Sequence, residues 1–163
     1  MFLISESIKF MNIEENLKNH QIELEDSPTP AGNYVPYIIT NKLVFISGQL
    51  PFKQGKIPIT GVVGEKVSSE DAIEMAKLCA LALISQLKSA CEGDLNKVSR
   101  VVKLGGFVAS SSSFTSQPTI INGASDIMVK VFGDQGKHSR FAVGVSSLPL
   151  NAPVEIEGIF ELK

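Results

Sequence analysis

The sequence predicts an α+β fold in which helices cover one face of a mixed β-sheet. Three observations lead to this prediction. The segments follow the order hairpin, helix, strand, helix, two strands. The longest helical segment has a wide apolar face, which is typical of a helix packed on a sheet. The last strand alternates apolar and acidic residues, so one of its faces is buried. The second face of the sheet then needs cover, which an oligomer commonly supplies.

Residues 1–24 are expected to be an N-terminal extension and a short helix, followed by one domain over residues 25–163. Asn12 is suited to cap the helix, with Glu15 three residues later. The start has no basic region and no small-residue cleavage site, so we predict no signal peptide. No apolar run approaches the roughly 20 residues that span a bilayer. We therefore expect a soluble, cytoplasmic protein, and either Met1 or Met11 could be the start.

A loop and a hairpin come next. Residues 25–33 contain two prolines and a glycine and predict a loop. Two apolar, β-branched segments flank Asn41-Lys42, which predicts a hairpin ending near Gly48. Residues 51–67 contain five Gly or Pro residues and predict an irregular connection, with one short strand around Val62-Val63.

The long helix is expected between Ser68 or Ser69, as its cap, and Gly93, which closes it. Both cysteines of the chain, Cys79 and Cys91, fall within it. Twelve residues of helix place them roughly 18 Å apart, which is too far for a disulfide. We expect both to be buried thiols. With two cysteines and two histidines, a structural zinc site is not expected.

The remaining chain predicts three strands and a second helix. Residues 98–110 are β-branched, and Gly105-Gly106 within them indicates a bulge or a close approach of another segment. A serine-rich loop leads into a helix at about 118–132. A turn precedes the strands expected at 139–148 and 153–162.

Charge and motifs exclude several functions. The formal net charge is -2 and the basic residues are scattered, so a broad nucleic-acid surface is not expected. The serine run at 110–113 has no His-Asp partner pattern for a nucleophilic triad. The glycines at 61 and 64 lack the Lys-Ser/Thr ending of a phosphate loop.

Seven segments of the chain carry a resemblance when taken together: Asn33–Pro36, Phe45–Pro51, Val101–Val108, Gln117–Ser125, Ser139–Val145, Leu148-Pro149 and Val154–Glu157. In this order they resemble the YjgF/Rid family, also labelled endoribonuclease L-PSP. Arg140 precedes Glu155 by 15 residues, which is the spacing of the family. The resemblance covers roughly residues 25–163. It implies a chorismate-mutase-like fold with two helices on one face of a mixed sheet, and a homotrimer whose sheets form a central barrel with clefts between neighbours.

The resemblance also implies an activity, the hydrolysis of enamines and imines derived from amino acids to 2-keto acids and ammonia. Arg140 would hold the substrate carboxylate, because a guanidinium can donate two parallel hydrogen bonds to it. Glu155 would orient or activate the water. No metal or organic cofactor is implied. Five further positions match the family's cleft: Tyr34 near the water, Ser47 and Gly48 in the lining, the N–H of Ala142 beside the carboxylate, and Asn122.

Structural alternatives stay open for these residues. Arg140 could pair with an acid at an interface, Glu155 could lie on a solvated strand face, and Tyr34 could be a surface aromatic. His138 precedes Arg140 by two residues and could share its face, but it lies in a polar turn. If Glu155 and Glu157 are both buried, a nearby arginine would stabilise them and lower their pKa values.

The chain also departs from the family pattern around the cleft. Residues 33–36 read Asn-Tyr-Val-Pro in place of Pro-Tyr-Ser-Gln, the loop at 109–118 is longer, and residues 137–139 replace an aromatic-proline pair. Three functions are therefore considered: a deaminase, a non-catalytic binder of small carboxylates, and, last, an endoribonuclease.

Overall fold

The computed structural model describes residues 12–26 and 32–163. The expectations for the extension at residues 1–10 and for Met11 lie outside these ranges, as does the middle of the loop expected at 25–33. The described residues form three α-helices and five strands. These are α1 (Ile13–Asn19), α2 (Ser69–Ala90), α3 (Gln117–Phe132), β1 (Tyr37–Thr40), β2 (Leu43–Gln49), β3 (Val98–Ala109), β4 (Ser139–Val145) and β5 (Val154–Leu162).

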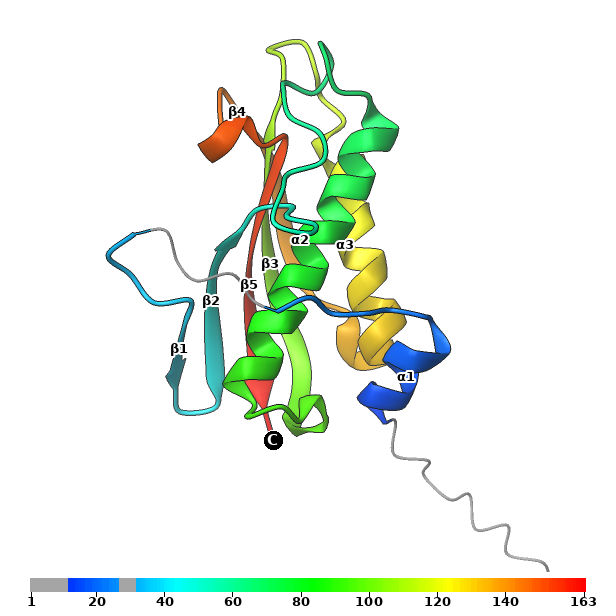
Figure 1. Ribbon diagram of the computed structural model, residues 1–163, viewed down its shortest axis with the longest axis vertical. Coiled ribbons are helices and arrows are strands. Elements are labelled where there is room, and N and C mark those ends of the chain that lie inside the picture. Colours follow the sequence, from blue (N-terminus) through cyan, green and yellow to red (C-terminus); the bar gives the residue numbers. More distant parts are fainter. Residues whose placement is uncertain (1–11, 27–31) are drawn as a thin grey trace, which may run out of the picture.

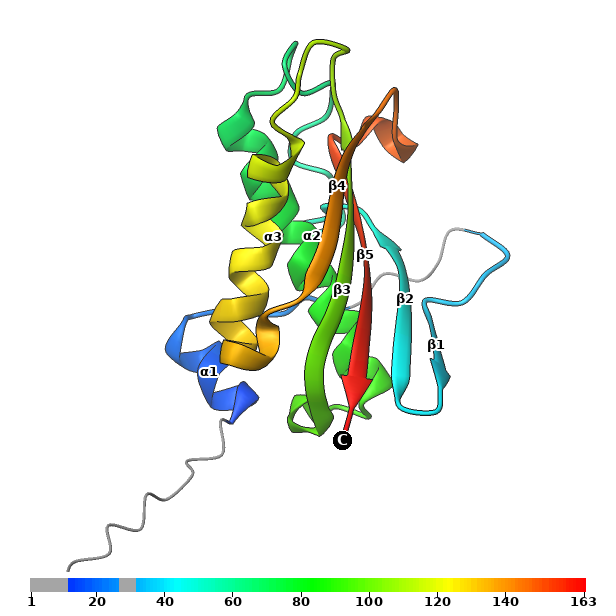
Figure 2. The same cartoon turned by 180° about the vertical axis from the view of Figure 1, so that it is seen from behind.

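The strands form one mixed sheet in the order β1-β2-β5-β3-β4. β3 and β4 are parallel, and the other neighbouring pairs are antiparallel. Helices α2 and α3 cover one face of this sheet (Figure 1). The view from behind shows the opposite face of the sheet without a helix over it (Figure 2). The predicted α+β class and the mixed sheet are confirmed, and this second face is the one expected to need cover.

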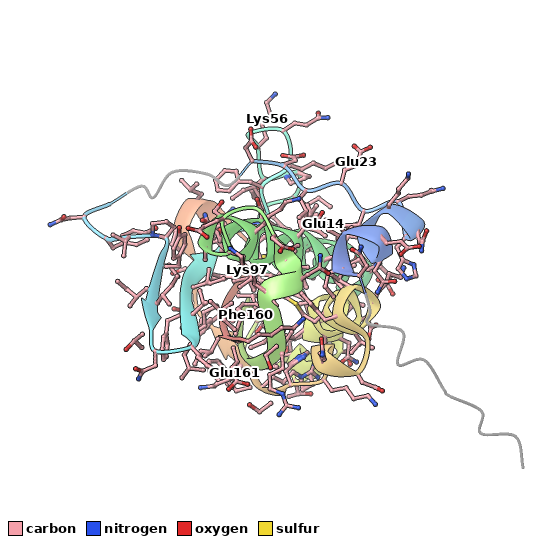
Figure 3. The ribbon with its side chains drawn as sticks, turned by 90° about the horizontal axis from the view of Figure 1, so that it is seen from below. Glu14, Glu23, Lys56, Lys97, Phe160 and Glu161 are labelled. Carbon is pink, nitrogen blue, oxygen red and sulfur yellow. The ribbon has the colours of Figure 1, made fainter. Side chains whose placement is uncertain are left out.

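The core lies between the sheet and the two long helices. β5 contributes to it every second residue, because successive side chains of a strand point to opposite faces. Val154, Ile156 and Phe160 are fully buried. Phe160 lies in the interior when the molecule is seen from below, and its neighbour Glu161 belongs to the other face of the strand (Figure 3).

Helix α2 has the predicted start and an earlier end. The Ser68 side chain accepts a hydrogen bond of 3.1 Å from the Asp71 N–H, as expected of an N-cap. The helix ends at Ala90, three residues before Gly93. Gly93 nevertheless completes the turn, because its N–H donates to the Lys88 carbonyl at a φ of 90°. Cys79 and Cys91 are free and buried, as predicted.

Helix α1 lies where a short helix is expected within residues 1–24, and it is separate from the two helices expected on the sheet. Asn12 caps it by accepting from the Glu15 N–H. It packs against the end of α3, where the Asn16 amide donates to the carbonyls of Lys130 and Val131. α1 therefore extends the helical layer and does not cover the sheet itself.

The glycine pair of β3 allows close approach and makes no bulge. β3 changes register earlier, between residues 98 and 103. A Cβ at Gly106 would lie 2.6 Å from Ile121 of α3, and one at Gly105 would lie 2.7 Å from the Glu157 carboxylate. The short strand expected at Val62-Val63 is wrong, because Val63 makes only isolated bridges.

Candidate functional site

Arg140 lies on the helix side of the edge strand β4. Its register partner on β3 is Leu104, which is fully buried under the helices. The Arg140 side chain reaches α3, where Nη1 donates to Ser125 Oγ at 3.0 Å and Nη2 donates to the Pro118 carbonyl at 3.1 Å. A guanidinium has five N–H groups, so others remain for a ligand.

Asn122 and Ala142 lie beside Arg140. Residues 118, 122 and 125 follow the i, i+4, i+7 pattern of one helix face, so Asn122 lies between the two residues that Arg140 contacts. Ala142 is two residues further along β4, on the same side as Arg140. We call Arg140, Ala142 and Asn122 the arginine edge.

Arg140 makes no ion pair with the described residues, since the salt bridges among them all involve lysines. Among residues 12–26 and 32–163, pairing with an acid is therefore not what holds this side chain. A cation fixed at a sheet edge by two neutral acceptors keeps its charge available to an anion.

Glu155 lies on the opposite, open face of the sheet. Its neighbours Val154 and Ile156 are buried under the helices, so the side chain between them points away. Its register partner is Phe107 of β3. The Glu155 carboxylate occupies the space where a Cβ at Gly48 would be, so a residue without a side chain at 48 leaves room for it.

The charge of Glu155 is poorly stabilised in a single chain. Burial raises the pKa of Glu155, and the neighbouring carboxylate of Glu157 raises it further. Within one chain no arginine acts on the pKa of Glu155, because Arg140 lies on the other side of the sheet, and Glu155 is only half-buried, so the condition for a stabilising arginine is not met there. A carboxylate with a raised pKa is suited to accept a proton from water.

Ser47 precedes Gly48 and holds the segment that follows Tyr34. Ser47 Oγ donates to the Val35 carbonyl at 2.9 Å, and the Ser47 N–H donates to the Pro36 carbonyl at 3.0 Å. These bonds hold the segment after Tyr34 against β2, and the Tyr34 side chain is 54% exposed. We call Tyr34, Ser47, Gly48 and Glu155 the glutamate face.

The arginine edge and the glutamate face cannot meet in one chain. Two strand spacings separate β4 from β5, which is about 10 Å, and three separate β4 from β2, which is about 14 Å. Arg140 and Glu155 also point to opposite sides of the sheet. The structure thus gathers the predicted residues into two groups, and one copy alone does not place both groups on one ligand.

Two further features extend the predicted site. Ser125 and His138 form hydrogen bonds next to Arg140; the spacing of two already indicates His138, whereas no pattern in the sequence indicates a role for Ser125. A groove of about 600 Å³ also lies where β4 ends and α3 begins, past Ala142. Its polar lining comes from the serine-rich loop, the start of α3 and the residue after β4, including Ser110, Ser111, Gln117 and Ser146, and Glu65 and the apolar Phe114 also line it.

The fold and these two groups define a class of protein: a small α+β chain with an arginine held by neutral acceptors at one sheet edge and a carboxylate on its open sheet face. A family model described as "YjgF/chorismate mutase-like, putative endoribonuclease" matches residues 14–161, and the chain belongs to this family. The chorismate-mutase-like fold expected from the resemblance is confirmed.

Individual relatives support the same family assignment. The Trypanosoma cruzi protein TCP17 is 42% identical over 92% of this chain and 94% of its own length. The chloroplastic reactive intermediate deaminase A of Arabidopsis thaliana is 32% identical over 90% of this chain and 68% of its own. An Agrobacterium tumefaciens protein of unknown function, Atu1372, has a solved structure with 46% identity and a TM-score of 0.87, over 93% of this chain and 92% of its own. In the described part of the chain, no helix is long and apolar enough to cross a membrane.

Proposed function

We propose that the protein hydrolyses small imines or enamines derived from amino acids, giving a 2-keto acid and ammonia, in sites formed between copies of a homotrimer. The observation that carries the proposal is the division of the site. The arginine edge can hold a carboxylate, the glutamate face can activate water, and only a second copy can bring them to one substrate.

The chemistry assigned to each group is simple. The Arg140 guanidinium binds the substrate carboxylate by charge-assisted hydrogen bonds. Glu155 accepts a proton from a water molecule as the water oxygen attacks the imine carbon. The C–N bond then breaks, the nitrogen leaves as ammonia after gaining protons, and the carbon is left as a ketone. The Tyr34 hydroxyl, Ser47 and Gly48 line the water side, while Ala142 and Asn122 line the carboxylate side.

The oligomer is supported by the open sheet face. Phe45 and Val143 on this face are 40% and 42% exposed in one chain. Phe107 and Phe141 pack edge to face on it at 5.2 Å, with the Lys103 ammonium over the Phe141 ring. An apolar face with charged groups at fixed places is typical of a surface that a second copy covers.

The test is a coupled assay in which an amino-acid oxidase supplies imines from a panel of amino acids. We expect faster 2-keto acid release with the wild type, loss of that acceleration in Arg140→Ala, and retention in Arg100→Ala, which changes the other arginine of the chain. No acceleration on any imine by a folded oligomer would refute the deaminase proposal.

A second candidate is carboxylate binding without turnover. The observation that favours it is the hydroxyl-lined groove, which makes the rim of this site more polar than an imine of a small apolar amino acid needs. Ligand-induced stabilisation by 2-keto acids without product formation would favour this candidate. RNA cleavage ranks last because the chain is net acidic, and RNase activity that persists in Arg140→Ala through repeated purification would favour it.

A further inference from the structure

His138 and Ser125 lie behind Arg140 and connect it to the backbone through three hydrogen bonds. His138 Nδ1 is 2.6 Å from the Gly136 carbonyl oxygen, and His138 Nε2 is 3.0 Å from Ser125 Oγ. Ser125 Oγ in turn accepts from Arg140 Nη1 at 3.0 Å. The chain of bonds thus joins the turn before β4, the middle of α3 and the guanidinium.

The partners determine the direction of each bond. A carbonyl oxygen can only accept, so the hydrogen of the neutral His138 ring is on Nδ1 and Nε2 is an acceptor. Ser125 donates its hydroxyl hydrogen to Nε2. A lone pair of the same oxygen then accepts from Arg140. One arrangement of the hydrogens therefore gives each group in this series of hydrogen bonds a partner.

Arg140 is held from two sides. Its second terminal nitrogen, Nη2, donates to the Pro118 carbonyl at 3.1 Å. With both terminal nitrogens bonded to α3, the guanidinium plane cannot rotate without breaking a hydrogen bond. A planar group held in this way loses less entropy when it binds a planar carboxylate.

We infer that Ser125 and His138 are positioning residues, which hold the Arg140 guanidinium in the plane that receives the ligand carboxylate, through a hydrogen-bond chain that requires an uncharged imidazole. The inference rests on the proposed role of Arg140 in carboxylate binding. Ser125 and His138 act through Arg140 and do not touch the ligand.

Protonation of His138 would reverse the direction of its hydrogen bond with Ser125. Nε2 would then donate to Ser125 Oγ, and an imidazolium and a guanidinium would share one oxygen. Burial lowers the pKa of His138, the Gly136 hydrogen bond opposes that effect, and the charge of Arg140 lowers the pKa further. Two more charged groups precede the ring in the turn, Asp134 and Lys137, and they pair with each other at 2.7 Å.

The chain of bonds can be tested without any ligand, by nitrogen-15 NMR of the whole protein. The sequence has two histidines and two arginines. With His20→Gln and Arg100→Lys in place, the remaining histidine ring signals come from His138 and the remaining arginine Nε–H signal comes from Arg140. We expect the Nδ1–H tautomer at neutral pH and a titration midpoint below 6.5. The Arg140 signal should be sharp above this midpoint, broad below it, and broad at every pH in Ser125→Ala. An Nε2–H tautomer, or a sharp Arg140 signal in Ser125→Ala, would overturn the inference.

The functional consequence is tested with 2-oxobutanoate, a small 2-keto acid, in calorimetric titrations. Loss of one hydrogen bond should weaken binding about 3- to 10-fold in Ser125→Ala and in His138→Leu. The wild type should bind 2-oxobutanoate more weakly in acid, where His138 becomes protonated. His138→Gln, whose amide oxygen can take the place of Nε2, should bind like the wild type at neutral pH and should not weaken in acid. Ser113→Ala, a change in the exposed serine loop, is the matched control.

The outcomes separate the two proposals. Equal affinities of wild type, Ser125→Ala and His138→Leu, or tighter wild-type binding in acid, would overturn the positioning role while the deaminase proposal stands. Absence of 2-oxobutanoate binding by the wild type, with the NMR signature as expected, would overturn the proposed function and leave the hydrogen-bond chain supported by its own measurement.

Discussion

The arginine edge and the glutamate face differ in how a single chain completes them. Arg140 is held by Ser125 and Pro118, so its polar contacts within the chain are already formed. Glu155 faces an uncovered sheet surface, where burial and Glu157 disfavour its charge. One half of the site is therefore completed by the fold of the chain itself, while under the proposed function the other half needs a partner surface.

The strongest test of this comparison separates the subunits. Val143 on the open face and Val129 on α3 are the same residue type with exposures of 42% and 40%. Val143→Asp should produce monomers without activity, because a buried unpaired carboxylate at an interface is costly. Val129→Asp should remain an oligomer with activity. Sedimentation velocity checks both, and a monomeric wild type would contradict the interface model.

A mixing experiment asks whether each site takes its halves from two copies. Arg140→Ala and Glu155→Gln should each be inactive alone. In refolded mixtures, a site that draws on two copies pairs an intact Arg140 with an intact Glu155 in about a quarter of cases for random assembly. We therefore expect about a quarter of wild-type activity to return. If both groups acted within one copy, the mixture would stay inactive.

A smaller effect is expected at Gly48, which belongs to the glutamate face and lies against the Glu155 carboxylate. The methyl group of Gly48→Ala would occupy the space of the Glu155 carboxylate and displace this flexible side chain. We expect kcat to fall about 10- to 100-fold with little loss of thermal stability. A fully active Gly48→Ala would show that the position of Glu155 does not matter.

The smallest effect concerns stability as a function of pH. The pKa of Glu155 is raised in the folded state above its ordinary value of 4.5, so its favourable contribution is complete below pH 4.5 and is lost as pH rises through the folded pKa. Glu155→Gln should therefore be more stable than the wild type at neutral pH, with the difference vanishing in acid. Denaturant unfolding at several pH values measures it, with the exposed Glu70→Gln as control. A Glu155→Gln variant that is less stable at neutral pH would show that the charge is stabilised.

Helix starts and strand faces could be predicted from residues that are neighbours in the sequence. Ser68 begins α2 because its hydroxyl satisfies a free N–H, and the alternation in β5 separates Phe160 from Glu161. Gly93 closes α2 as predicted, and the last helical residue, Ala90, lies three residues before it because a glycine terminates a helix from beyond its last turn. The expected strand at Val62-Val63 failed because β-branched residues favour a strand only where a neighbouring strand is available.

The sequence by itself determined the α+β order, the family and the candidate residues of the site, since these depend on composition and spacing along the chain. Only the tertiary structure decided which of those residues can act together. Whether Arg140 and Glu155 share a face depends on strand order and on which neighbours are buried, and these are long-range pairings that spacing does not encode. For the same reason the bond from Ser125 to His138 and Arg140 became visible only when α3 was packed on β4.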